Sequence, residues 1–215
     1  MQDLHETWIA IKLGGIIVLP LSLLAIIAMA IMFEKAFVYW RYARLPLDLL
    51  GIVETYGFAW EELEKRLYGL NDSHYYRRFF KVVIANRNRP AWWTESRAAD
   101  EAQLIEALLA RRLWVLETIV TAAPLLGLMG TIVGMMDSFK IIGGSGIVNP
   151  TGVTGGVAQA LIATAIGLLI ALISLFGFNY FSRAQAQIID EMERLGTRLI
   201  DHIRLDQQGG AHEAA

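Results

Sequence analysis

The chain has 215 residues, of which 55% are hydrophobic and only 19% are charged, with a mean hydropathy of +0.43. Soluble domains carry about 25% charged residues, so this composition argues against an ordinary soluble enzyme. The absence of cysteine excludes a disulfide scaffold, a zinc–thiolate site, an iron–sulfur cluster and a thiol nucleophile. The net charge of −2 gives no footprint for nucleic acid. We therefore expect no cofactor, no metal and no nucleic-acid partner.

Three runs of the sequence contain no Asp, Glu, Lys or Arg. They are residues 13–33, 118–136 and 141–182, which are 21, 19 and 42 residues long. A helix needs about 20 apolar residues to cross the hydrocarbon core, so each run is long enough to span a membrane. We predict an all-α integral membrane protein with three transmembrane helices, at 13–33, 118–136 and 157–181.

The orientation of the chain is predicted from Lys and Arg near the ends of the spans. These residues gather after the first span, before the second and after the third, whereas the opposite side has two lysines. The segment 34–117 and the tail 182–215 are therefore expected in the cytoplasm. The N-terminus, 1–12, and a Gly-rich loop, 137–156, are expected in the periplasm.

Two apolar stripes at helical spacing predict helices outside the spans. The first stripe indicates a helix that runs straight into the second span: Ala102, Ile105, Leu108, Leu109, Leu113 and Leu116. The second indicates that the third span continues as a long cytoplasmic helix: Ala184, Ile188, Met192, Leu195, Leu199 and Ile203. Shorter helices are expected over 46–89, with breaks at these turn-forming positions: Gly57, Gly69, Asn71, Asp72 and Pro90.

The second and third spans each carry one stripe of small or polar residues. In the second span the stripe is Pro124, Gly127, Thr131, Gly134 and Ser138. In the third span it is Ala160, Thr164, Gly167, Ala171 and Ser174. Small residues let membrane helices approach closely, which assigns helix packing to Gly127, Gly134, Ala160, Gly167 and Ala171. We expect three helices to be too few to cover the third-span stripe, and this predicts a homo-oligomer.

Two threonines and one glutamine are the candidate pore residues. Thr131 lies about 8 Å from the outer end of its span and Thr164 about 10 Å, so the two hydroxyls share one depth. Such a pair can line a proton pathway, whereas each Thr alone more often bonds a carbonyl of its own helix. Gln159 lies off the stripe of Thr164, and its alternative role is an interhelical hydrogen bond.

Two stretches, 123–136 (APLLGLMGTIVGMM) and 159–168 (QALIATAIGL), resemble the ExbB/TolQ/MotA proton-channel family, particularly its ExbB and TolQ branch. The resemblance implies a pentamer in the bacterial inner membrane, built around an ExbD- or TolR-like single-span partner and acting on a TonB- or TolA-like protein. By position, Thr131 and Thr164 correspond to the pore threonines of that family. Gln159 departs from the pattern, which usually has Glu there, and an amide cannot hold a transferable proton.

Two functional hypotheses follow, and neither is an enzyme. In the first, the chain is a proton-channel or stator subunit that couples the proton motive force to TonB- or Tol-dependent work on the outer membrane, with protons and membrane lipids as its other partners. In the second, it is a non-conducting scaffold that assembles the partner proteins. In that case the small-residue stripes only pack helices and Gln159 marks a lost proton path.

Overall fold

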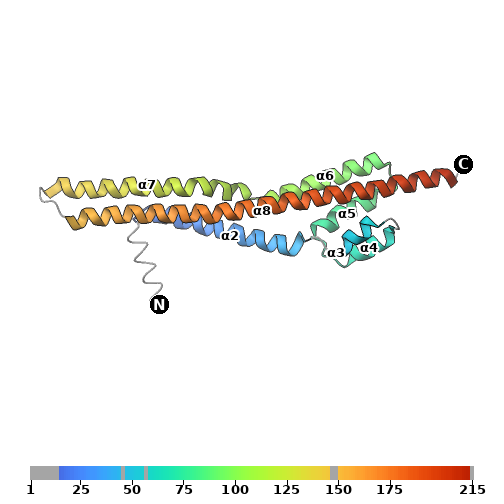
Figure 1. The fold of residues 1–215 in the computed structure, drawn as a ribbon, viewed down its shortest axis with the longest axis horizontal. Helices are drawn as coiled ribbons and strands as arrows, with labels where there is room; N and C mark the ends of the chain where they lie inside the picture. Colours follow the sequence, from blue (N-terminus) through green and yellow to red (C-terminus); the bar gives the residue numbers. More distant parts are fainter. Residues whose placement is uncertain (1–14, 45–46, 56–57, 146–149, 214–215) are drawn as a thin grey trace. The chain divides into compact units, whose positions relative to one another are not determined.

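The computed structural model describes residues 15–44, 47–55, 58–145 and 150–213, and the regular structure of these residues is entirely helical (Figure 1). The prediction of an all-α chain is confirmed for this part of the sequence. The helices, in chain order, are α2 (Val18–Tyr42), α3 (Leu47–Glu54), α4 (Trp60–Tyr68), α5 (Tyr75–Asn86), α6 (Ala91–Ala110), α7 (Leu113–Ser145) and α8 (Pro150–Glu213).

Three stretches of helix are long and apolar enough to cross a membrane. They are Val18–Tyr42, Ala91–Phe139 and Thr154–Gln208. The contacts divide the chain into two units, which we call the apolar unit (described residues of 1–33 and 112–181) and the charged unit (described residues of 34–111 and 182–215). The three apolar stretches agree with the predicted number of spans.

Within the apolar unit, α2 runs in the same direction as α8. Gly15, just before α2, lies against the side chain of Gln159, and Met32 lies against Gly177. The second contact lies closer to the C-terminus than the first on both helices, so the two helices are parallel. In Figure 1, α2 and α7 both lie alongside α8 in this part of the chain.

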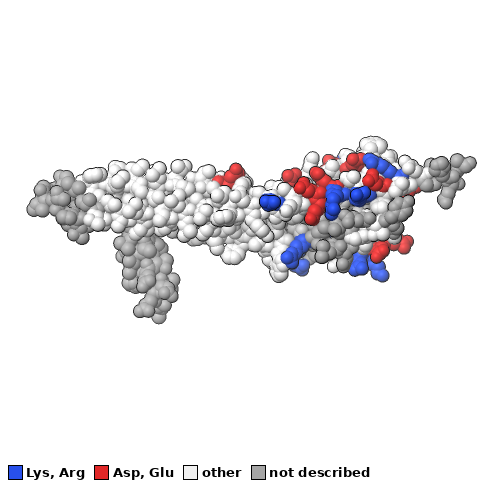
Figure 2. Space-filling model, viewed as in Figure 1, with Lys and Arg blue, Asp and Glu red and all other residues white. Residues whose placement is uncertain are grey.

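The surface of the apolar unit consists largely of exposed aliphatic and aromatic side chains. Leu125 is 66% exposed and Phe176 68%, and the same holds for many others: Leu19, Leu23, Ile26, Leu128, Ile132, Leu161, Leu168 and Leu172. Contiguous exposed apolar surface of this extent is typical of a membrane-facing protein. On the face seen in Figure 2 this unit carries almost no charged atoms.

The charged unit has a hydrophobic core of the kind found in water-soluble proteins. Its largest fully buried side chains come from α3, α4, α5, α6 and α8: Leu49, Leu63, Tyr76, Phe79, Phe80, Ile105, Leu109, Met192 and Leu195. The predicted stripe of α8 is confirmed, because its members from Ile188 to Ile203 are buried. Basic and acidic side chains both gather on the surface of this unit in Figure 2.

The first predicted stripe does not run unbroken into the second span. The helix stops at Ala110 and restarts at Leu113, and Arg112 has a φ of 69°, in the left-handed region. Within the charged unit, the Lys35 ammonium is buried and donates a hydrogen bond to the Leu109 carbonyl at 2.6 Å. The last carbonyls of a helix have no intrahelical donor, so this lysine stabilises the break.

The loop expected over 137–156 is mostly helical. Helix α7 continues to Ser145 and α8 begins at Pro150, while residues 146–149 lie outside the described part. Proline is well suited to the first turn of a helix, where its missing N–H has no partner to lose. Glycine is more frequent in membrane helices than in soluble ones. A Gly-rich sequence is therefore a weak indication of a loop in this segment.

The short helices of the charged unit follow the predicted breaks. Gly69 is the C-cap of α4, and Pro90 is the N-cap of α6. Between α4 and α5, the Ser73 backbone N–H donates to the Asn71 side-chain oxygen at 3.0 Å, which makes an Asx turn. The break expected at Gly57 lies outside the described residues.

Candidate functional site

The backbones of α7 and α8 touch along a seam of small residues. A Cβ added to Gly167 would lie 2.5 Å from the Ala123 carbonyl oxygen and 3.1 Å from the Gly127 α-carbon. A Cβ added to Gly127 would lie 3.0 Å from the Thr164 α-carbon. These atoms belong to backbone, so a side chain at Gly167 would force the two helices apart, and one at Gly127 would need a shift of a few tenths of an ångström.

The same seam continues toward the α7–α8 connection. A Cβ on Gly134 would lie 3.0 Å from both the Ala160 Cβ and the Gly156 carbonyl oxygen. The buried Ser138 hydroxyl donates to the Gly134 carbonyl at 2.9 Å and lies against Gly156. Since later residues of α7 meet earlier residues of α8, the two helices are antiparallel, as consecutive spans must be.

The expectation that three helices are too few to cover the third-span stripe is wrong. Ala160 is 3% exposed, Ala171 8% and Ser174 0%, so one protomer already covers this face. The contacts above show that glycines let α7 approach closely enough to bury much of it. The Ser174 hydroxyl has no hydrogen-bond partner among the described residues. Oligomerisation needs a different surface.

The hydroxyls of the two candidate threonines donate to two adjacent carbonyls, both of which belong to α7. The Thr164 hydroxyl crosses from α8 to α7 and donates to the Gly127 carbonyl at 2.9 Å. The Thr131 hydroxyl donates to the Leu128 carbonyl of its own helix at 2.6 Å. The structure therefore brings the two side chains to one level of α7. Among the described residues, no hydrogen bond joins the two hydroxyls to each other.

Both carbonyls have a second, intrahelical donor. In a regular α-helix the Gly127 carbonyl also accepts the N–H of Thr131, and the Leu128 carbonyl that of Ile132. A carbonyl oxygen has two lone pairs, so it can accept both donors. If a hydroxyl turns away, its carbonyl remains paired. Each threonine hydroxyl is therefore available to a stronger acceptor at small cost.

Gln159 lies at a different place, against the residue that precedes α2. Gly15 has a φ of +70°, and a Cβ there would collide with the Gln159 amide nitrogen and lie 3.0 Å from its Cδ. The positive φ favours glycine here, and a larger residue would also force the Gln159 side chain to move. Gly15 was not predicted as a site residue, because no local sequence pattern indicates that an amide from the third span lies beside it.

The chemistry available in the uncharged runs is limited to hydrogen bonding. These runs supply hydroxyls and three amides, Asn149, Gln159 and Asn179, and they contain no Asp, Glu, Lys, Arg or His. Neither a hydroxyl nor an amide gains or loses a proton near neutral pH. Among the described residues, no group of three His, Asp or Glu could hold a metal ion. The site can order water or orient a titratable group that another molecule supplies.

These features define a three-span helical membrane protein whose second and third spans form a close, hydroxyl-bearing seam. The model of the MotA/TolQ/ExbB proton channel family matches residues 71–194. The chain belongs to this family. It is a multi-pass inner-membrane protein of ExbB type, and its family consists of proton-channel and transport subunits rather than known enzymes.

Three proteins that are similar to this chain come from three different organisms. A putative biopolymer transport protein ExbB-like 3 of Synechocystis sp. is 33% identical over 174 residues, which cover 78% of this chain and 81% of that protein. The biopolymer transport protein ExbB of Aquifex aeolicus is 43% identical over 84 residues, 39% of this chain and 56% of that protein. A putative ExbB homolog of Methanothermobacter thermautotrophicus is 25% identical over 189 residues, 85% of this chain and 64% of that protein.

Proposed function

We propose that the chain is the proton-channel or stator subunit of an energy-transducing complex. It assembles as a homopentamer around an ExbD- or TolR-like single-span partner, and proton flow through the complex drives a TonB- or TolA-like protein. The N-terminus and the α7–α8 connection face the periplasm, while the charged unit and the C-terminus face the cytoplasm. The distribution of Lys and Arg supports this orientation.

The observation that carries the proposal is the pair of threonine hydroxyls on adjacent carbonyls of α7. Thr164 and Thr131 donate to Gly127 and Leu128, in spans that contain no Asp, Glu, Lys, Arg or His. A proton path through hydrocarbon needs a titratable carrier. The carrier therefore belongs to the partner, and the resemblance to ExbB and TolQ points to an Asp on its single span.

The geometry supports a donor exchange at this level of the membrane. A carboxylate is a stronger acceptor than a neutral carbonyl, so a deprotonated Asp would draw a threonine hydroxyl away from α7. The carbonyl would keep its intrahelical N–H. When the Asp is protonated, the hydroxyl returns to the carbonyl. Thr164 and Thr131 would thus hold the carboxylate in two neighbouring positions, one for each hydroxyl.

In this proposal Gln159 belongs to the pathway as a positioning group. It cannot exchange a proton, and its contact with Gly15 ties the start of α2 to α8. Gly127, Gly134, Ala160, Gly167 and Ala171 keep α7 and α8 in contact, so that the Thr164 hydroxyl can reach across the seam.

The second candidate is a non-conducting scaffold, and one observation favours it. Both threonine hydroxyls already have acceptors within one protomer, and the small residues are accounted for by packing alone. A protein with this seam could hold partner spans without passing protons.

Proton flux into proteoliposomes under a membrane potential separates the two candidates. We expect little flux with the chain alone and clear flux with the partner present. Thr164→Val, which removes the donor, should abolish the flux, and Thr164→Ser, which keeps a hydroxyl, should retain most of it. Assembly of each variant with the partner is checked by co-purification. Full flux from an assembled Thr164→Val complex would overturn the channel role of this residue. Absence of flux from the wild-type complex would favour the scaffold.

A further inference from the structure

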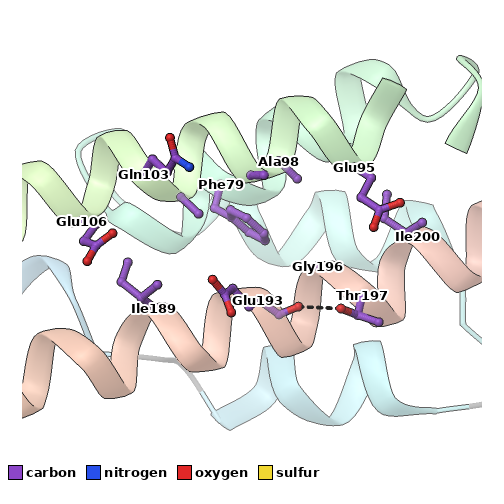
Figure 3. A pocket seen from close by; sticks show the side chains of 12 residues that line it. Phe79, Glu95, Ala98, Gln103, Glu106, Ile189, Glu193, Gly196, Thr197 and Ile200 are labelled. Atoms are coloured by element: carbon purple, nitrogen blue, oxygen red, sulfur yellow. Dashed lines mark hydrogen bonds between the residues drawn. The ribbon is translucent and has the colours of Figure 1, made fainter. Parts of the chain in front are cut away.

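The charged unit contains a groove between α6 and α8, shown in Figure 3, with a volume of about 290 Å³. Its floor is apolar and formed by the buried side chains of Phe79, Ala98 and Ile200. Gly196 keeps it open, because a Cβ there would lie 3.0 Å from the Phe79 ring. A groove of this kind accepts an apolar stem rather than a small polar ligand.

The rim of the groove is acidic. Glu95, Glu106 and Glu193 line it, together with Gln103 and Thr197. Glu95 forms an ion pair with Arg204 at 3.1 Å, whereas Glu106 and Glu193 have no ion pair among the described residues. An occupant therefore combines apolar stems with positive ends, which is the chemistry of Arg or Lys side chains.

Helix α8 carries that chemistry on a neighbouring face. Arg183, Arg194 and Arg198 are separated by eleven and four residues and are exposed, so they form one stripe along the helix. At about 100° per residue, the stripe lies roughly 80–140° around α8 from Glu193. Among the described residues, no ion pair involves Arg183 or Arg198. The charged unit thus has an acidic groove and a basic stripe on two different faces of one helix.

We propose that a second copy of this chain docks on the groove, with the arginine stripe of its α8 against Glu193 and Glu106. This inference rests on the proposed homo-oligomer and identifies a surface that assembles it. Two different faces meeting head to tail generate a ring, rather than a two-fold dimer, when the rotation between copies closes. Copies related by rotation about the membrane normal stay at one height, so Glu193 meets Arg194 and Arg198 of its neighbour.

The absence of cysteine makes this interface testable by cross-linking. A chain carrying both Glu193→Cys and Arg198→Cys, treated in native membranes with a short bismaleimide, should give a ladder of bands beyond the dimer. Each single-cysteine chain should stop at the dimer or below. As a matched control, Glu62→Cys with Arg198→Cys places one exposed cysteine on α4, away from the groove, and should give no ladder.

Charge exchange provides the second arm. The reporter is a second cross-linking pair on the same two faces, Glu106→Cys with Arg183→Cys. Adding Arg198→Glu or Glu193→Arg to this chain should lower the yield of the ladder at least several-fold. The double change should restore it.

The outcomes separate this inference from the proposed function. An oligomer by native mass spectrometry without a Glu193–Arg198 ladder would overturn the interface and leave the channel subunit standing. A cross-link from Glu193→Cys to a smaller protein instead would assign the groove to that partner and overturn docking of a second copy. A monomer by native mass spectrometry would contradict both proposals.

Discussion

The two units of the molecule hold their helices together in opposite ways. In the apolar unit, glycine and alanine bring backbones into contact, and the large side chains such as Leu125 and Phe176 are exposed. In the charged unit, large side chains such as Tyr76 and Phe80 are fully buried and the exposed surface is charged. The sizes of buried and exposed residues are thus reversed between the units.

The difference follows from the solvent of each unit. Water drives large apolar side chains inward, and their burial stabilises the fold in proportion to area. Lipid is as apolar as leucine, so membrane helices gain little by burying large side chains and associate through close contact and hydrogen bonds. Glycine therefore helps to hold the helices together in the apolar unit, as phenylalanine does in the charged unit.

Polar groups differ in the same way. In the charged unit, carboxylates bind other side chains: the Tyr76 hydroxyl donates to Glu191 at 2.7 Å, and Arg78 pairs with Glu101 at 2.7 Å. In the apolar unit, hydroxyls such as that of Thr164 donate to backbone carbonyls. Hydroxyl groups can be satisfied in hydrocarbon without a charge, whereas a carboxylate there is costly.

The largest expected effect comes from breaking the aromatic core. Phe79→Ala removes a side chain that is 1% exposed and should lower the stability of the charged unit by about 3–5 kcal/mol. Hydrogen–deuterium exchange should show faster exchange in α5 and α6 and little change along the α7–α8 seam. Trp92→Ala, at a side chain 67% exposed, is the matched control and should have little effect. Equal loss of protection in both units would contradict their separate packing.

The next effect comes from adding one methyl group to the seam. Gly167→Ala places a Cβ 2.5 Å from the Ala123 carbonyl oxygen and should lower the melting temperature in detergent, at a cost of about 1–3 kcal/mol. Gly155→Ala, in the same helix with nothing within 4 Å of the added Cβ, should be neutral or stabilising. A similar melting temperature for the two variants would show that the close contact does not hold α7 to α8.

A smaller effect separates the two threonines. Thr164→Val removes a hydrogen bond between helices and should cost about 0.6 kcal/mol, with an upper limit of about 1.7 kcal/mol. Thr131→Val removes a bond within one helix, so its cost should be near zero. Unfolding in mixed detergent measures both variants. A larger loss for Thr131→Val than for Thr164→Val would contradict the assignment of donors.

The smallest effect is a pH dependence confined to the charged unit. Burial lowers the pKa of His74 below its ordinary value of 6.5, the Arg41 guanidinium lowers it further, and a hydrogen bond to the Arg44 backbone opposes both. The folded state therefore binds the proton less readily than the unfolded state. Stability should level off above pH 6.5 and fall as the pH drops below it. His74→Gln should flatten this part of the curve measured by thermal unfolding, and an unchanged slope would contradict the role of His74.

Local patterns predicted much of this molecule, and long-range contacts limited the rest. The spacing of Gly127 and Thr164 along their helices was enough to place both on packing faces, because helix geometry is fixed by sequence position. The acceptor of each hydroxyl was not predictable, since it depends on which way the side chain turns. Lys35 is one of the basic residues that follow the first span, and in the sequence it indicated only the orientation of the chain. Its contact with Leu109 joins residues far apart in the sequence.

The contact between Gly15 and Gln159 has a consequence for the length of the first span. A second contact joins Met32 and Gly177, which lie 17 residues after Gly15 and 18 residues after Gln159. The two parallel helices are therefore in contact at two points, one near each end of the first span. Deleting or inserting one residue between Gly15 and Met32 would displace one contact by about 1.5 Å and rotate it by about 100°. Substitutions on the exposed side of α2 leave both contacts intact. The first span is therefore free to vary on its exposed side but is fixed in residue number.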